Sequence, residues 1–116
     1  EVERASPDDF KKNTVIGVVA TDAKLSKAQC KAFATVAHDG ITRAVFPSHT
    51  TFDGDLIFSV STGEKELEEN FNDLLYINQA AALCVSRSIA RGVYHASNSP
   101  IDTFPSYKNK FKIKDL

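Results

Sequence analysis

The sequence predicts a mixed α/β fold in which two strands alternate with two helices. The β-branched and apolar run Thr14–Thr21 (TVIGVVAT) has the length of a strand and the composition of one buried on both faces. From Lys27 to about Val45, small and apolar residues recur three and four positions apart, which is typical of an amphipathic helix. The same order then repeats, with a strand over Leu56–Ser61 and a long helix over 71–94.

Capping and turn residues set the limits of these elements. Ser26 is a candidate N-cap for the first helix, and Pro47 ends that helix because proline has no backbone N–H to donate. The loop that follows covers Ser48–Asp53. Glu64–Asn70 carries four glutamates and one lysine and is interpreted as a solvated loop, and the turn signal at 98–100 (NSP) ends the second helix.

The end of the chain alternates apolar residues with lysines. The apolar positions are Tyr107, Phe111 and Ile113, and lysines occupy 108, 110, 112 and 114. Alternation with a period of two predicts an edge strand whose outward lysines prevent aggregation. An anion-binding patch is the alternative interpretation of the same lysines.

Composition excludes several classes of protein. The 116 residues include 14 Lys and Arg against 15 Asp and Glu, so no excess of positive charge is available to bind a nucleic-acid backbone. The longest apolar runs are six residues, far below the roughly 18 that a membrane span needs. Cys30 and Cys84 fall in predicted helices without metal-ligand spacing and are interpreted as small buried thiols. We therefore expect a cytoplasmic protein with no cofactor, no metal, and no nucleic-acid or membrane partner.

The domain organisation points beyond this chain. It contains no methionine, and two strands with two helices do not easily close a core, so we expect a piece of a longer product. Residues 1–13 are polar and contain Ser-Pro-Asp-Asp, which predicts a linker. Residues 14–116 would then be the C-terminal part of a single domain shared with an upstream fragment.

Most searches for catalytic motifs fail. There is no glycine-rich phosphate loop, no GxSxG elbow and no CxxC. His38, His49 and His95 are widely spaced; we interpret the first and last as structural or solvated, and His49 as a brace for its loop. What remains is Asn13-Thr14, where the linker meets the first strand, and Asp53-Gly54-Asp55, which precedes the second.

A threonine at the start of a strand can become a nucleophile in one step. While it is internal, its hydroxyl is weakly nucleophilic and has no base beside it. If the Asn13–Thr14 bond were cut, Thr14 would gain an α-amine with a pKa of about 8, which can act as general base for its own hydroxyl. A carboxylate such as Asp53 or Asp55 could hold that amine. The alternative explanation is structural: Asn13-Thr14 only begins a strand, and Asp53-Gly54-Asp55 only forms a turn.

Three stretches carry a resemblance to a known family. They are NTVIGVVATDAKLSKAQ (13–29), AHDGITRA (37–44) and PSHTTFDGDLIF (47–58). Together they resemble the DmpA-type L-aminopeptidase/D-Ala-esterase-amidase family, most closely its nylon-oligomer hydrolase branch. The resemblance implies a self-cleaving N-terminal-nucleophile-type hydrolase with an αββα sandwich, also found in ornithine acetyltransferase, to which this chain supplies the C-terminal part.

The resemblance also assigns residues. Asn13-Thr14 matches the self-cleavage site, Thr14 matches the nucleophile, and Asp53 and Asp55 match the paired positions that contact the nucleophile's amine. It implies that the upstream fragment stays bound and carries the oxyanion donors, that substrates are small amides, esters or short peptides, and that the protein is a homo-oligomer. Two alternatives stay open: an acyltransferase resembling ornithine acetyltransferase, and a non-catalytic, unprocessed assembly module.

Overall fold

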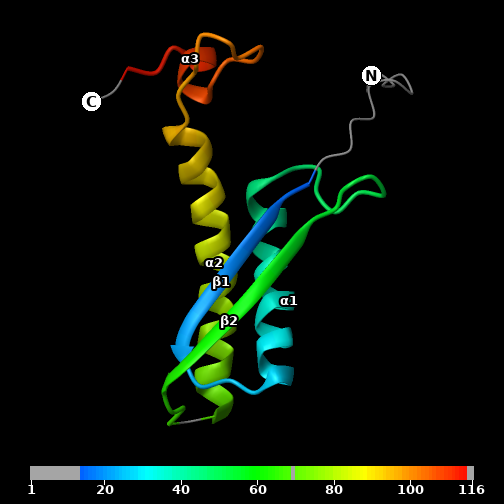
Figure 1. Cartoon of the computed structure of the whole chain (residues 1–116), viewed down its shortest axis with the longest axis vertical. Helices are drawn as coiled ribbons and strands as arrows, with labels where there is room; N and C mark the ends of the chain where they lie inside the picture. Colours follow the sequence, from blue (N-terminus) through cyan, green and yellow to red (C-terminus); the bar gives the residue numbers. More distant parts are fainter. Residues whose placement is uncertain (1–13, 69, 115–116) are drawn as a thin grey trace.

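A computed structural model describes residues 14–68 and 70–114 of the chain. The order of elements is β1 (Ile16–Ala23), α1 (Lys27–Ala44), β2 (Leu56–Lys65), α2 (Asn70–His95) and α3 (Tyr107–Phe111). This confirms the predicted alternation of two strands with two helices (Figure 1). Within the described ranges, no helix is long and apolar enough to cross a membrane. The predicted linker, residues 1–13, lies outside them.

The two strands pair in parallel, with α1 as the connection between them. Pairing begins at Ile16 opposite Leu56 and becomes irregular beyond Thr21. The second strand continues to Lys65 and α2 begins at Asn70, so the prediction of a solvated loop over Glu64–Asn70 is wrong for its first two residues and its last. The reason for the longer strand lies across the sheet, where the Lys65 carbonyl accepts a hydrogen bond from the Lys24 backbone N–H at 2.7 Å.

Local capping explains where α1 begins. The Ser26 hydroxyl accepts a hydrogen bond from the Gln29 backbone N–H at 3.2 Å, and the Gln29 side chain accepts one from the Ser26 N–H at 2.8 Å. This reciprocal pair satisfies two of the donors that a helix N-terminus leaves open. It confirms Ser26 as the N-cap. The helix ends at Ala44, three residues before Pro47, as expected.

Both long helices lie on one face of the sheet (Figure 1). They approach each other closely at Gly40 of α1, where an added β-carbon would meet the Ala82 carbonyl oxygen and lie 2.6 Å from the Val85 β-carbon of α2. The core forms where these helices meet the inner face of the sheet. Its buried members are Val19, Phe33, Ala37, Ile41, Ile57, Ala81 and Val85.

The opposite face of the sheet is apolar and open to solvent. It carries Ile16, Val18, Leu56, Phe58 and Val60, which are 43–68% exposed. The prediction that the first strand is buried on both faces is therefore wrong within this chain. The physical reason is that both helices pack on the same side, so no described element covers the other.

The C-terminal segment folds as a short helix rather than the predicted edge strand. Ser106 caps α3 by accepting a hydrogen bond from the Asn109 backbone N–H at 3.4 Å. Tyr107 and Phe111, four residues apart, lie on one side of the helix with ring centroids 4.9 Å apart. The apolar residues thus follow the helical spacing of four, and β1 and β2 are the only strands in the described residues.

The cysteines differ from expectation in their burial. Both lie on helices as predicted, but Cys30 is half-buried and Cys84 is exposed. The interpretation as two buried thiols is therefore wrong. Cys84 faces the groove between β1 and α2, which α1 does not fill.

Candidate active site

Parallel pairing brings the start of β1 beside the loop that leads into β2. The first paired positions are Ile16 and Leu56, so the residues just before them lie side by side. The Thr14 hydroxyl oxygen, Oγ1, lies 3.0 Å from the position that a β-carbon would take on Gly54. The strand register thus places the predicted nucleophile against the predicted Asp53-Gly54-Asp55 turn, although 38 or more residues separate them in the sequence.

Asp55 connects this loop to β1. Its carboxylate oxygen Oδ1 accepts a hydrogen bond from the Val15 backbone N–H at 2.9 Å, directly after Thr14. The other oxygen, Oδ2, accepts from the His49 backbone N–H at 3.1 Å and from His49 Nδ1 at 2.7 Å. The Asp55 side chain is only 5% exposed. Its burial opposes ionisation, but the hydrogen bonds from Val15 and His49 outweigh burial and lower the Asp55 pKa below its ordinary value.

Asp53 has a different position. Its Oδ2 accepts a hydrogen bond from the Thr50 backbone N–H at 2.8 Å, and its own N–H donates to the Thr50 carbonyl at 3.0 Å. These bonds close the turn from Thr50 to Asp53, an arrangement that aspartate side chains often stabilise. Asp53 therefore shapes the loop that presents Asp55.

His49, for which the sequence predicts only a role in bracing its loop, belongs to the site because it contacts Asp55. It braces the loop, as expected, but through the Asp55 carboxylate. Its backbone has a φ of 55°, an uncommon conformation for a residue other than glycine. Its ring lies 5.7 Å from that of His38 on α1, whose Nδ1 contacts the Ala34 carbonyl at 2.8 Å. The sequence does offer one indication of this contact. His49 lies six residues before Asp55, in a loop short enough to bring the two side chains together.

The predicted cleavage bond is described on one side only. Thr14 is exposed at the start of the chain's described part, whereas Asn13 lies outside it. Within the described residues, no three His, Cys, Asp or Glu side chains are grouped so that they could hold a metal ion.

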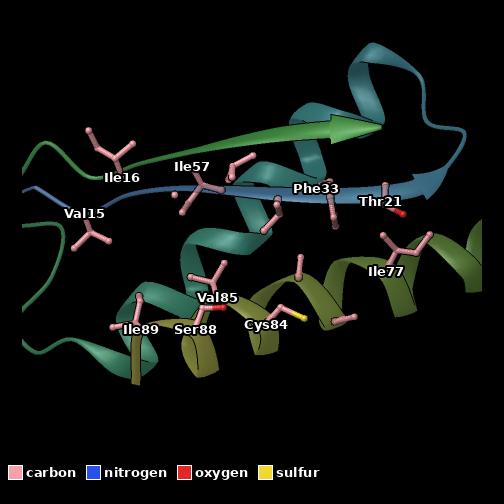
Figure 2. A pocket seen from close by; sticks show the side chains of 16 residues that line it. Val15, Ile16, Thr21, Phe33, Ile57, Ile77, Cys84, Val85, Ser88 and Ile89 are labelled. Atoms are coloured by element: carbon pink, nitrogen blue, oxygen red, sulfur yellow. The ribbon is translucent and has the colours of Figure 1, made fainter. Parts of the chain in front are cut away.

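An apolar groove of about 540 Å³ runs between β1 and α2 (Figure 2). Val15 and Ile16 line one end on the strand side, and Ile77 and Ile89 line it on the helix side. Its polar lining is limited to Thr21, Cys84 and Ser88 side chains, so the charged groups of the Asp55 loop lie outside it. The groove supplies apolar surface beside the site rather than reacting groups.

Comparison with known proteins assigns the chain to a class. Residues 1–102 match the model of the family described as Peptidase family S58, and the chain therefore belongs to this family. The match confirms the resemblance drawn from the three sequence stretches.

The curated relatives are considerably longer than this chain. An uncharacterized aminopeptidase of Mycobacterium tuberculosis is 37% identical over 109 residues, covering 85% of this chain and 31% of that protein. A 6-aminohexanoate-oligomer endohydrolase of Paenarthrobacter ureafaciens is 34% identical over 65 residues, covering 56% of this chain and 18% of that protein. The matched region thus spans less than a third of either relative.

Proposed function

We propose that this chain is the nucleophile-bearing part of a self-cleaving N-terminal-nucleophile hydrolase that acts on small amides, esters or short peptides. The observation that carries the proposal is the position of the Thr14 hydroxyl beside Gly54, next to the hydrogen bond that Asp55 accepts from the Val15 N–H. Membership of a peptidase family supports the same chemistry. So do the names of the relatives, an aminopeptidase and an oligomer endohydrolase.

Maturation begins with Thr14. Its hydroxyl oxygen attacks the carbonyl carbon of Asn13 and gives up its proton. The Asn13–Thr14 C–N bond then breaks as an ester forms, and the departing nitrogen takes up a proton to become the free Thr14 amine. Water then hydrolyses the ester, releasing a carboxylate on Asn13 and restoring the hydroxyl. The amine and the hydroxyl that catalysis needs thus appear in the same event.

Turnover repeats the attack on an external substrate. The Thr14 amine takes the hydroxyl proton while Oγ1 bonds to the substrate carbonyl carbon, and the leaving amine or alcohol departs with a proton. Water hydrolyses the resulting ester and regenerates Thr14. In this scheme Asp55 holds the start of β1 in place and supplies negative charge near the Thr14 ammonium. Asp53 keeps the turn from Thr50 to Asp53 closed and so holds Asp55 in this position.

The scheme requires an upstream fragment of the same precursor. The open apolar face of the sheet, with Val18 and Phe58 more than half exposed, needs a cover, and a second sheet from that fragment would complete an αββα sandwich. The same fragment would supply oxyanion donors. Assembly into a homo-oligomer belongs to this proposal as well.

The test uses the precursor that contains this chain, analysed by denaturing gel and N-terminal sequencing. We expect a fragment that starts at Thr14, no cleavage with Thr14→Ala, and cleavage with Thr14→Ser, which retains a hydroxyl. Hydrolysis of an aminoacyl p-nitroanilide and of a 6-aminohexanoate oligomer is then measured. A different fragment start, or full hydrolysis by Thr14→Ala, would contradict the proposal. Acyl transfer to an added amine in preference to water would favour the acyltransferase, and an intact, inactive chain would favour the assembly module.

A further inference from the structure

The Asp55 carboxylate is held between two parts of the chain, and His49 provides both contacts on one side. The φ of 55° at His49 turns its backbone N–H and its ring toward the same oxygen, Oδ2. Because an ionised carboxylate only accepts hydrogen bonds, Nδ1 of His49 carries the proton in this pair. The opposite oxygen is left to the Val15 N–H.

The His49 ring is itself supported. The His49 side chain is about one-third exposed, and its ring centroid lies 5.7 Å from that of His38, with the two ring planes tilted by 50°. His38 is anchored to the backbone of α1 through the Ala34 carbonyl. A continuous set of contacts therefore leads from α1 through His38, His49 and Asp55 to the residue that follows Thr14.

We propose that His49 is a positioning residue, which acts through Asp55 to orient the start of β1 and with it the Thr14 nucleophile. The inference rests on the proposed function, because it concerns the same reaction. Removing the ring donor would leave the nearly buried Oδ2 with one hydrogen bond in place of two and free the carboxylate to rotate. A nucleophile misplaced by about 1 Å can lose on the order of 100-fold in rate.

The experiment compares two substitutions in the precursor. His49→Phe keeps a ring to pack on His38 but removes the donor, whereas His49→Asn retains a short donor and adopts positive φ readily. We expect His49→Phe to slow self-cleavage and to lower kcat on the p-nitroanilide by about 10-fold or more, with KM and the melting temperature nearly unchanged. His49→Asn should recover most of the rate. His95→Phe, at the end of α2, is the matched control and should keep wild-type rates.

Two results would overturn the proposal. One is a wild-type rate for His49→Phe. The other is a loss of rate in both variants that follows a fall in melting temperature, which would mean that His49 only stabilises the loop. If His49→Phe does not fold, His49→Ala takes its place in the same comparison. Thr14→Ala distinguishes a failure of the proposed function from a failure of the positioning role. If the Thr14→Ala protein is active, the proposed function is refuted. If it is inactive while His49→Phe is fully active, only the positioning role is refuted.

Discussion

Thr14 and Gly54 lie side by side, and a side chain on Gly54 would fit only if the Thr14 hydroxyl gave way. The hydroxyl oxygen of Thr14 lies 3.0 Å from where that β-carbon would be, which is closer than ordinary van der Waals contact. The pairing of β1 with β2 sets this distance, so it links the strand register directly to the candidate nucleophile.

Gly54→Ala should therefore impair the reaction more than the fold. The added methyl group forces Thr14 Oγ1 to move by a few tenths of an ångström, and we expect a loss of about 10-fold or more in self-cleavage rate. Gly92→Ala is the matched control, because a β-carbon there meets nothing within 4 Å. It should leave the rate intact and add about 0.5–1 kcal/mol of stability, since alanine is favoured in a helix interior. Equal rates for both variants would contradict the importance of the Thr14–Gly54 contact.

Gly40→Ala tests the packing of α1 on α2. The new methyl group would overlap the Ala82 carbonyl and the Val85 side chain, so the helices must separate. Overpacking of this kind costs about 1–3 kcal/mol. We expect a clear fall in the melting temperature of the precursor, measured by calorimetry, with Gly92→Ala again as the control. A wild-type melting temperature would show that the two helices adjust freely.

The two aspartates should differ in the consequences of their loss. Asp55→Ala leaves three donors without their carboxylate, so we expect both a lower melting temperature and a loss of about 100-fold or more in kcat. Asp53→Ala opens the turn at Thr50 and should reduce kcat with a smaller effect on stability. Because both act on one loop, the double substitution should cost far less than the product of the single losses. Multiplicative losses would mean that the two carboxylates act independently.

The lowered pKa of Asp55 predicts a loss of stability in acid. A carboxyl whose folded pKa lies below its unfolded value stabilises the fold fully above the unfolded value, about 3.9, and progressively less as pH falls through the folded value. Urea unfolding of the precursor between pH 6 and pH 3 should show this decline. The same titration of Asp55→Asn, which does not ionise, should be flatter below about pH 4. Identical pH dependence in both proteins would contradict the assignment.

The open sheet face predicts dependence on the upstream fragment. Expressed alone and trimmed to Thr14, this chain leaves Ile16, Val18 and Phe58 in water, and we expect it to aggregate or to melt without cooperativity. Co-expression with the upstream fragment should restore a cooperative melt and hydrolysis of the p-nitroanilide. A lone fragment that melts cooperatively and hydrolyses substrate would refute the two-fragment proposal.

Local signals were sufficient to predict most of the elements. The apolar run of β1, the three- and four-residue spacing in α1, the Ser26 cap and the stop before Pro47 all depend on neighbours within a few residues. The C-terminal helix was missed because its short pattern fits a period of two as well as a spacing of four. Only the Ser106 cap and the packing of Tyr107 on Phe111 distinguish the two.

The sequence by itself identified Thr14, Asp53 and Asp55 as candidate site residues. Each lies in a short continuous motif, and these motifs match a family pattern. The tertiary structure decided which of them meet. Strand register brings Thr14 to Gly54, and a loop that folds back at His49 brings that side chain onto Asp55. Such contacts depend on the pairing of segments about 40 residues apart and on one left-handed backbone conformation, neither of which leaves a periodic pattern in the sequence. Burial of the sheet was also decided by the tertiary structure. Both helices pack on one side of the sheet, and this placement determines which of its two apolar faces is covered.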